Sequence, residues 1–488
     1  MTQSPSLRRL SDPRTDSATP QQQTLGINLL AKHLHFVGIG GCGMSGLARL
    51  ARKRGAVCSG SDRAASDITQ ALTDEGFNVA LQQTTATVPN ACDMLVVSAA
   101  IKDDHPEVTE AKRRGVEVVK YAKLLGQLML GRTGVAIAGT HGKSTTTSLL
   151  SHILIQCKLD PSFIVGANCE QIGGGVRCGQ SDTLIVEACE FDRSFHNFHP
   201  THAVILNVEE DHLDFYSGID EIVETFRVFA QKVDETPKTS GGGGGSLLIN
   251  HEMPHRMKIT AGLDSKVETI GFAPQADWCV EVVSNRVYLH QSGKCVASWA
   301  SPMPGDHMAY NSAAAAVTAH RLGAEWEAIG EAIAGFEGLD RRMQIIGETR
   351  INHGRVTVID DYGHHPTEID TTLRALRRRY DPKRLVCVFQ PHQHSRTRFL
   401  LEQFATSFSE ADIVIVPQIF FVRDSENERH AVRAADLVDR LRQRGKRAMH
   451  LYPFGAIVEH LQVITQPGDL LVTMGAGDVW KVAREFLK

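Results

Sequence analysis

The sequence predicts an α/β protein of about three domains with mostly parallel sheets. Its 488 residues are too many for one ordinary core, since a domain commonly holds about 150 residues. Short apolar runs without polar alternation recur between amphipathic stretches, and such runs suit strands that are buried on both faces. The runs are Leu34–Ile39, Met94–Val97, Val135–Ala138, Leu184–Val186, Ala203–Leu206, Val356–Ile359, Leu385–Phe389, Ile413–Val416 and Leu470–Thr473.

The order of these runs predicts the domain limits. Residues 1–26 are rich in Ser, Thr, Gln and Arg, which is typical of a disordered tail. The first domain is expected over 27–132, the second over 133–342 and the third over 343–488, because a new strand follows each limit. A run of five glycines predicts a flexible insertion at about residues 235–246 of the second domain.

Composition excludes several classes of protein. A formal charge of −4 argues against a general nucleic-acid binder. No apolar stretch reaches the length of about eighteen residues that a membrane-spanning helix needs, so no membrane insertion is expected. The ten cysteines are scattered and form no C-x-x-C pair, which favours a reducing compartment and hence a cytoplasmic location.

A polar residue or a glycine follows most of the apolar runs directly. Ligands of open parallel sheets bind beyond the carboxyl ends of the strands, so this pattern predicts ligand-binding domains that face one cleft. The residues are Gly38, Ser98, Gly139, Glu187, Asn207, Asp360, Gln390 and Gly475.

The first glycine-rich loop follows the first strand and opens a helix. Gly38, Gly40 and Gly43 form G-x-G-x-x-G, in which backbone amides can approach a diphosphate. Asp62 ends the next strand, where a carboxylate could bind a ribose hydroxyl. The pattern indicates a nucleotide diphosphate, and NAD fits it as well as a UDP-sugar does. A merely tight strand–helix turn is the plainer alternative.

A second glycine-rich loop, G-T-H-G-K-S, precedes the amphipathic stretch Ser144–Ile155. Its amides could cradle phosphates, with Lys143 on the β/γ oxygens and the Ser144 hydroxyl on Mg²⁺. The strict G-x-x-x-x-G-K-[ST] pattern fails, because Ile137 stands where the first glycine belongs. A buried strand before the loop and a helix after it favour an NTP site over a glycine turn with a solvated lysine.

Two clusters of acidic residues and histidine follow later strands of the same domain. Glu187 and Glu190 follow one strand, and Asp211 and His212 follow the next. Carboxylates beside a phosphate loop can hold Mg²⁺, and a neutral imidazole can add a ligand for a second ion. Each cluster alone could be solvated loop residues, but together with the phosphate loop they indicate a two-metal NTP site.

The last third of the chain carries His-His and His-x-His pairs. A metal site there is not favoured, because no cysteine or spaced carboxylate completes a tetrahedral set. A site that binds a substrate carboxylate through Arg396 or Arg398 is the favoured interpretation, since guanidinium binds carboxylates through two hydrogen bonds. Surface histidines at the start of a helix are the remaining alternative.

Taken in order, six motifs resemble those of the Mur ligases, over about Leu34 to Gly477. They are G-I-G-G-C-G-M-S-G-L-A, A-G-T-H-G-K-S-T-T-T, V-E-A-C-E-F-D, N-V-E-E-D-H-L-D, D-D-Y-G-H-H-P-T-E and F-Q-P-H-Q-H-S-R-T-R. The motifs look most like those of family members that add L-alanine to UDP-N-acetylmuramate. The glycine loop and D-D-Y-G-H-H-P favour that activity over the ligation of a whole peptide, which is the nearest alternative within the family.

The resemblance implies three domains: an N-terminal Rossmann-like domain for the UDP-sugar, a central P-loop ATPase domain and a C-terminal Rossmann-like domain for the amino acid. It implies peptidoglycan precursor synthesis from UDP-N-acetylmuramate, L-alanine and ATP with Mg²⁺, through an acyl phosphate. An NAD-dependent oxidoreductase and a nucleotide-gated regulator are the rival functions, and both leave later motifs unexplained.

The resemblance also assigns residues. The UDP-sugar would contact Gly38, Gly40, Gly41, Gly43, Asp62 and Ser98. ATP would contact Gly139, Thr140, His141, Gly142, Lys143, Ser144, Thr145, His307, Asn311, Arg342 and Asp361. Ser144, Glu187 and His212 would be metal ligands, and His364, His365 and Arg396 would line the amino-acid and acyl-phosphate region. The catalytic set would be Lys143, His212, His364 and Arg396.

This chain departs from the family pattern at several positions. Cys42 replaces a usual isoleucine, Cys189 replaces an aspartate, and His394 occupies a usually aromatic position. Several family members use a carbamylated lysine about fifteen residues beyond the D-H motif, where this chain has Arg227. Arginine cannot form a carbamate, and Lys232 is more than one helical turn further on, so no carbamate is expected.

Overall fold

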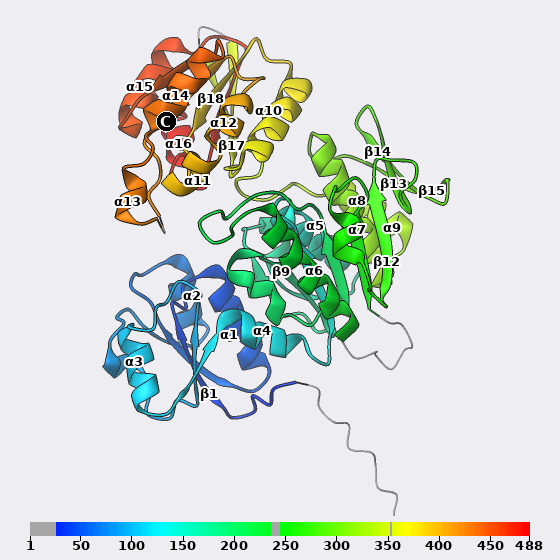
Figure 1. Ribbon diagram of the computed structural model, residues 1–488, viewed down its shortest axis with the longest axis vertical. Coiled ribbons are helices and arrows are strands. Elements are labelled where there is room, and N and C mark those ends of the chain that lie inside the picture. The colour runs from blue at the N-terminus through cyan, green and yellow to red at the C-terminus, as the bar shows by residue number, and fades with distance from the viewer. Residues whose placement is uncertain (1–25, 236–244, 352–353, 423) are drawn as a thin grey trace, which may run out of the picture.

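The computed structural model describes residues 26–235, 245–351, 354–422 and 424–488. Three sheets succeed one another along the chain, and each carries its own helices (Figure 1). Among the described residues no sheet crosses residue 132 or 342, although the domain limits themselves stay predictions. All but the last residue of the predicted tail, and the centre of the predicted glycine insertion, lie outside the described residues.

The N-terminal sheet has the order β3-β2-β1-β4-β5, and all its strands are parallel. The order reverses between β1 and β4, so the loop after β1 lies at the crevice where such sheets bind ligands. The strands are β1 (His33–Val37), β2 (Val57–Ser61), β3 (Asn78–Ala80), β4 (Met94–Val97) and β5 (Glu117–Lys120). The helices are α1 (Cys42–Lys53), α2 (Asp67–Asp74), α3 (Pro106–Arg113) and α4 (Tyr121–Met129), with the 3-10 turn η1 (Thr85–Thr87).

The middle sheet has the order β15-β14-β13-β12-β11-β10-β6-β9-β7-β8. It is parallel from β13 to β7, while β13, β14 and β15 form antiparallel hairpins. The strands are β6 (Thr133–Ala138), β7 (Ser162–Ile164), β8 (Val176–Arg177), β9 (Thr183–Ala188), β10 (His202–Ile205), β11 (Ser246–Asn250), β12 (Lys266–Gly271), β13 (Trp278–Val283), β14 (Arg286–Gln291) and β15 (Lys294–Ala300). The helices are α5 (Lys143–Gln156), α6 (Ile219–Glu235), α7 (Arg256–Thr260), α8 (Asp306–Arg321) and α9 (Trp326–Ala334), with η2 (Glu170–Ile172) and η3 (Phe191–Asn197).

The C-terminal sheet has the order β16-β17-β21-β18-β19-β20, parallel except for β16. Its strands are β16 (Gln344–Ile351), β17 (Gly354–Asp361), β18 (Arg384–Phe389), β19 (Ile413–Val416), β20 (Arg447–His450) and β21 (Asp469–Met474). Its helices are α10 (Pro366–Tyr380), α11 (His394–Phe399), α12 (Leu401–Thr406), α13 (Glu426–Arg429), α14 (Ala434–Gln443), α15 (Phe454–Ile464) and α16 (Trp480–Phe486).

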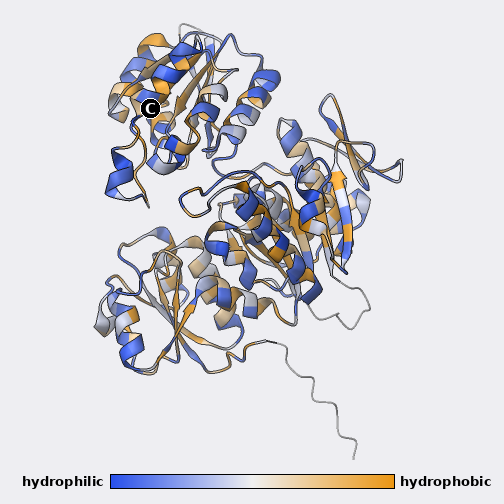
Figure 2. Ribbon diagram, viewed as in Figure 1, coloured by the Kyte–Doolittle hydropathy of each residue, from blue (hydrophilic) through white to orange (hydrophobic). Residues whose placement is uncertain are grey.

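The predicted α/β fold with mostly parallel sheets is confirmed, and every predicted apolar run overlaps a strand. In Figure 2 most strands are coloured as hydrophobic, whereas the outward faces of many helices are coloured as hydrophilic. The hairpins of β13, β14 and β15 were not predicted. Their sequences interleave polar and apolar residues, because these strands are only partly buried.

The first helix of the middle domain, α5, packs in a buried core. The run Ala313–Ala316 of α8 is fully buried, and these small side chains let α8 lie closely beside α5. Leu149 and Ile153 of α5 are buried in the same core. The loop before α5 is thereby fixed between the ends of β9 and β10, the two neighbours of β6. In the part of the chain that is described, no helix is both long and apolar enough to cross a membrane.

Candidate active site

The phosphate loop, residues 139–142, joins β6 to α5. Gly139 and Gly142 have φ angles of 144° and 84°, values that favour glycine. A Cβ at Gly142 would lie 2.7 Å from Oδ1 of Asn311, so a larger residue would not fit. Gly142 is the N-cap of α5 and has no side chain to bond the first amides of the helix. Those amides are the kind of donors that bind phosphate at a helix N-terminus.

Lys143 is held over this loop. Its Nζ lies 3.0 Å from Oε2 of Glu190 and donates to the carbonyl oxygens of Thr140, at 3.1 Å, and Gly139. Burial opposes the charge, but Glu190 together with Cys189 and Glu187 outweighs burial and raises the pKa of Lys143. The ammonium group is therefore charged at neutral pH and lies beside the helix N-terminus.

The backbone of His141, at the centre of the loop, is fixed by Asn207. Its N–H donates to Oδ1 of Asn207 at 2.7 Å, and its carbonyl accepts from Nδ2 at 3.0 Å. The sequence indicated Asn207 only as a polar residue after a strand. The side-chain amide of Asn207 fixes the backbone conformation of the phosphate loop at His141.

Glu187 is the last residue but one of β9, beside the phosphate loop, and accepts the Gly166 N–H at 2.7 Å. Burial raises its pKa, while Gly166, Lys143 and the Ser144 hydroxyl oppose that rise. The oxygens of Glu187 and Ser144 are thus neighbours, as the predicted metal role requires.

His212 lies across from this pair on the loop after β10. Its Nε2 is 4.0 Å from Oε1 of Glu190 and 3.8 Å from Oδ2 of Asp211. Its φ of 53° is unusual for a non-glycine residue, and such conformations concentrate at functional sites. The two predicted acidic clusters therefore meet at one point beside Lys143.

Arg396 reaches this point from the C-terminal domain. It is only 7% exposed, and its Nη2 and Nε lie 2.8 and 2.9 Å from Oδ1 of Asp211. Burial would raise the pKa of Asp211, but Arg396 holds that pKa well below its usual range. Nη1 of Arg396 is also 3.2 Å from Nδ1 of His392. A charge-assisted ion pair thus joins the middle and C-terminal domains.

His364 is a neutral imidazole in the same region. Burial and the charge of Arg396 hold its pKa well below the usual value. Its Nδ1 lies 3.2 Å from the Tyr362 carbonyl, a contact that assigns the proton to Nδ1 and leaves the lone pair on Nε2. His364 therefore has a nitrogen that can accept a proton.

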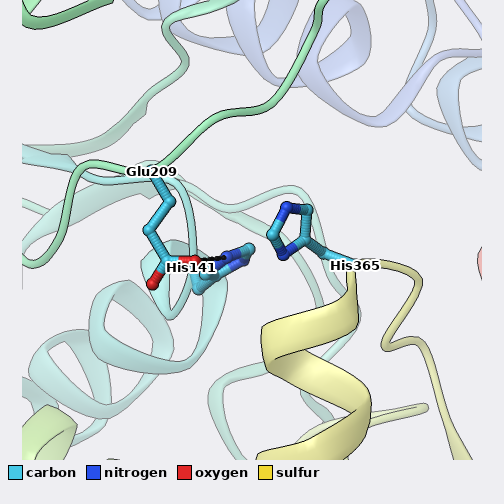
Figure 3. A group of neighbouring side chains, drawn as sticks. All are labelled: His141, Glu209 and His365. Atoms are coloured by element: carbon cyan, nitrogen blue, oxygen red, sulfur yellow. Dashed lines mark ion pairs between the residues drawn. The ribbon is translucent and has the colours of Figure 1, made fainter. Parts of the chain in front are cut away.

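His141 and His365 bring the two domains together a second time (Figure 3). Their ring centroids are 4.6 Å apart. Nε2 of His141 is 3.5 Å from Oε2 of Glu209, and Nδ1 is 3.4 Å from Oε1 of Glu368. Burial would lower the pKa of His141, but the two carboxylates raise it to about 9. His141 is therefore an imidazolium at neutral pH.

The atoms of His141, Glu209 and His365 lie within 4.8 Å of one another, close enough to raise the question of a metal ion. Both nitrogens of His365 are engaged, however: Nε2 with the Glu210 carbonyl at 3.0 Å and Nδ1 with the Thr367 N–H at 3.3 Å. A protonated His141 also repels a cation. The group is therefore an interdomain hydrogen-bond and charge cluster, not a metal site.

The main cavity, of about 650 Å³, opens between the phosphate loop and the C-terminal domain. Most of the predicted catalytic, phosphate and metal residues line it together. They are Thr140, His141, Gly142, Lys143, Ser144, Glu187, His212, Arg342, His364 and Arg396.

A second cavity, of about 340 Å³, adjoins the first. It is lined by the predicted residues His141, Gly142, Thr145, His307, Asn311, Arg342 and Asp361. Burial lowers the pKa of His307 to about 4. Asp361 accepts the N–H groups of Met343, at 2.8 Å, and Gly363, and burial raises its pKa to about 6. Gly139 lines neither cavity, and His365 lines a third one, of about 510 Å³.

The predicted UDP-sugar residues lie apart from these cavities, around the loop after β1. Oδ2 of Asp62 accepts the Gly40 N–H at 2.8 Å, so this carboxylate braces its own glycine loop. Cys42 donates to the Val165 carbonyl of the middle domain at 3.2 Å. Gly38, Gly41, Gly43 and Ser98 belong to the same end of the N-terminal sheet.

Some lining residues carried no separate assignment from the sequence. Trp480 and Arg484 of α16 line the main cavity, and so do Asn168 and Asp340, which hydrogen bond to each other at 2.7 Å. Glu368 lines both cavities, yet the sequence assigned it no role of its own, although it ends the motif D-D-Y-G-H-H-P-T-E. A capping glutamate and a cavity residue look the same in one sequence.

Comparisons with known families match most of the chain. The model of the Mur ligase family catalytic domain matches residues 33–133, that of the Mur ligase middle domain matches 137–319, and that of the Mur ligase glutamate ligase domain matches 341–477. The three matches follow the order of the three sheets.

Curated relatives match over almost their full length. The UDP-N-acetylmuramate–L-alanine ligase of Caldanaerobacter subterraneus is 39% identical, over 94% of this chain and 97% of the relative. The ligases of the same name from Lachnospira eligens and a Geobacter species are each 38% identical, over 93% of this chain and 98% and 97% of the relatives.

Solved structures share the fold. The UDP-N-acetylmuramate–alanine ligase of Thermotoga maritima has a TM-score of 0.73 at 24% identity, covering 93% of this chain and 98% of its own. A murein peptide ligase of Psychrobacter arcticus has a TM-score of 0.67 at 23% identity, covering 94% and 98%.

Proposed function

The chain belongs to the Mur ligase family, and from that premise we propose that it is an ATP-dependent ligase that joins L-alanine to the carboxylate of UDP-N-acetylmuramate. The relatives at 37–39% identity bear the name of that activity. The reaction belongs to the synthesis of peptidoglycan precursors.

One observation carries the chemistry. The phosphate loop and two acidic strand ends face the guanidinium of Arg396 and the neutral His364 across one cavity of about 650 Å³. A phosphoryl donor and an anionic acceptor repel each other, so they need cations and amides around the reacting atoms. Lys143, the amides of α5 and Arg396 are groups of that kind, and they come from two domains.

The donor set fits Mg²⁺. The hydroxyl of Ser144 and the carboxylate of Glu187 supply the oxygen ligands that Mg²⁺ prefers, and His212 adds a nitrogen. Mg²⁺ bound to these residues would neutralise charge on the triphosphate and on the transferred phosphoryl group. Glu190 and Lys143 adjoin the same ligands.

In the first step, a carboxylate oxygen of the sugar acid forms a bond to the γ-phosphorus of ATP. The bond from that phosphorus to the β–γ bridging oxygen breaks, and ADP leaves with the electron pair. Lys143 and the first amides of α5 stabilise the charge that develops on the phosphoryl oxygens and on ADP. Arg396 holds the acyl phosphate that results, through its two-donor edge.

In the second step, the amine nitrogen of L-alanine forms a bond to the acyl carbon, and the carbon–oxygen bond to phosphate breaks. The nitrogen must lose a proton, and the unprotonated Nε2 of His364 is the acceptor that we assign to it. His365 anchors the start of α10 to the middle domain through its 3.0 Å contact with the Glu210 carbonyl. Domain closure would exclude water, which would otherwise hydrolyse the acyl phosphate.

Substrate recognition is divided among the domains. The glycine loop after β1, with Asp62 and Ser98, would hold the UDP-sugar. His307 and Asn311 would lie near the adenine, in the cavity that adjoins the phosphate loop. Arg342 and Asp361 would meet ATP at the junction with the C-terminal domain. We place the enzyme in the cytoplasm, a reducing compartment that suits its ten free thiols.

Measurement of phosphate release tests the proposal. We expect release only when ATP, Mg²⁺, UDP-N-acetylmuramate and L-alanine are all present. Release that requires a peptide and ignores L-alanine would assign the chain to peptide ligation. No release, together with reduction of NAD by a hydroxy acid, would assign it to the oxidoreductases.

A further inference from the structure

Glu368 occupies the first turn of α10 and uses one carboxylate oxygen for the helix itself. Oε2 accepts the N–H groups of His364, at 2.9 Å, and His365, at 3.2 Å. The bond to His365, the N-cap residue, belongs to a capping box, and the stability of the helix alone would explain it. Oε2 also lies 3.4 Å from Nδ1 of His364.

The other oxygen, Oε1, makes contacts outside α10 that a helix cap does not require. Oε1 lies 3.4 Å from Nδ1 of His141 in the phosphate loop and 3.4 Å from Nη1 of Arg342 in the segment between the sheets. The side chain of Glu368 is only 11% exposed. One buried carboxylate thus joins cationic groups from the middle domain and from the linking segment to the start of α10.

The imidazole of His141 is consequently held from both domains. Glu209 of the middle domain approaches Nε2, and the ring of His365 lies alongside (Figure 3). Glu368 of the C-terminal domain approaches Nδ1. Asn207 already fixes the backbone of this residue. Any shift of α10 would therefore move the side chain of a residue whose backbone lies in the phosphate loop.

The position of Glu368 relative to the cavities is also unusual. Only four residues line both the main and the second cavity: His141, Gly142, Arg342 and Glu368, among the residues that the structure describes. They form the boundary between the cavity that contains Lys143 and the cavity that contains His307. ATP bound with its phosphates in one and its base in the other would pass this boundary.

We propose that Glu368 is a positioning residue for phosphoryl transfer: it orients His141 and Arg342 at the boundary of the two cavities and so couples the docking of the C-terminal domain to the phosphate loop. The inference rests on the proposed function, because it concerns the transfer of the γ-phosphoryl group. Glu368 acts through these neighbours and does not touch the reacting atoms.

Glu368→Gln tests the idea, because the amide oxygen can still accept the two N–H groups of the cap while the charge is lost. The matched control is Asp370→Asn, two residues along α10, which loses the same charge from a side chain that pairs with Arg374. The full chain is mixed with ATP, Mg²⁺ and UDP-N-acetylmuramate without L-alanine, and single-turnover formation of ADP is followed from about pH 7 to about pH 10.

In the wild type we expect the rate constant to fall as pH rises past about 9, where His141 loses its proton. Glu209, Glu368 and His365 are the titratable groups that face this imidazole, and only the first two raise its pKa. In Glu368→Gln the fall should begin at least about one pH unit lower, since one of two stabilising charges is gone. The plateau rate should drop about tenfold with little change in ATP affinity. Asp370→Asn should behave as the wild type.

A double-mutant cycle with His141→Gln provides the second measurement. If Glu368 acts through His141, the double variant should be no slower than the slower single variant. Independent, multiplying losses would overturn the proposal. So would a wild-type pH profile and plateau rate in Glu368→Gln, even with a lowered Tm, because that result describes a helix cap only. Failure of the proposed function is distinguishable, since the wild type itself would then form no ADP.

Discussion

The two glycine-rich turns of this chain have the same place between a strand and a helix but different surroundings. Each follows a strand that lies between two parallel neighbours and opens a helix, one after β1 and one after β6. Each has a glycine at positive φ: Gly38 at 76° and Gly142 at 84°. The helix after the first turn begins with Cys42, whereas the helix after the second begins with Lys143.

The neighbouring strand ends make the larger difference. Beside the first turn, Asp62 accepts the Gly40 N–H and so supports the backbone of the turn. Beside the second, Glu187, Glu190 and His212 gather around the lysine and the helix N-terminus. The comparison indicates that a glycine loop sets how closely a ligand approaches, while the residues on adjacent strands determine its chemistry. We therefore propose that the first turn binds a ligand and that the second serves phosphoryl transfer.

Lys143→Ala should have the largest effect, because it removes the charge that defines the second turn. We expect kcat to fall by about a thousandfold or more, since a preorganised cation at the transferring phosphoryl group is lost. UDP-N-acetylmuramate affinity, measured by calorimetry, should persist. Lys258→Ala, which removes an exposed charge on α7, is the control and should retain full activity. An equal loss of affinity for both nucleotides would remove the distinction between the turns.

Arg396→Lys should have the next largest effect, and it tests the C-terminal side of the second turn. An ammonium group cannot reproduce the planar two-donor edge, so kcat should fall by about ten- to a hundredfold. Arg398→Lys, two residues along α11 and paired with Glu428, is the matched control. Wild-type kinetics in the Arg396 variant would count against a bidentate role.

Gly40→Ala should have a smaller effect, and it should weaken only the ligand of the first turn. The added Cβ would lie 2.8 Å from both Oδ2 of Asp62 and Cγ2 of Thr69, so the loop must shift. We expect the Kd for UDP-N-acetylmuramate to rise by about tenfold, as a contact or two is misplaced. The ATP Kd of the same variant is the internal control and should not change. A rise in both would show that the first turn serves the whole fold rather than one ligand.

Removal of carbon dioxide should have no effect on turnover, because we expect no lysine carbamate near the second turn. Arg227 pairs with Glu224, and Lys232 lies in an ion pair with Glu235 at 2.8 Å, near the end of α6. We expect degassed enzyme to show the same turnover with and without bicarbonate. Recovery of lost activity by bicarbonate, abolished in Lys232→Ala, would place a carbamate on that lysine.

The sequence was sufficient for the fold class, because strands buried on both faces leave uninterrupted apolar runs. The sequence also predicted that Lys143 and Glu187 share one site, and both line the main cavity, while their roles stay predictions. It did not predict the contacts between domains, such as Arg396 with Asp211 or His141 with Glu368. Those pairs are separated by more than 180 residues, and their partner choice depends on how two folded domains dock. The hairpins β13 to β15 were missed for a simpler reason, since partly exposed strands lack a continuous apolar run.

Calorimetric titration of both nucleotides into both variants tests the central claim most directly, namely that the two glycine turns serve different ligands. UDP-N-acetylmuramate and a non-hydrolysable ATP analogue would each be titrated into Lys143→Ala and Gly40→Ala. We predict a crossed result: Lys143→Ala weakens only the ATP analogue, and Gly40→Ala weakens only UDP-N-acetylmuramate. A result in which each variant weakens both ligands to the same extent would contradict the assignment of the two turns.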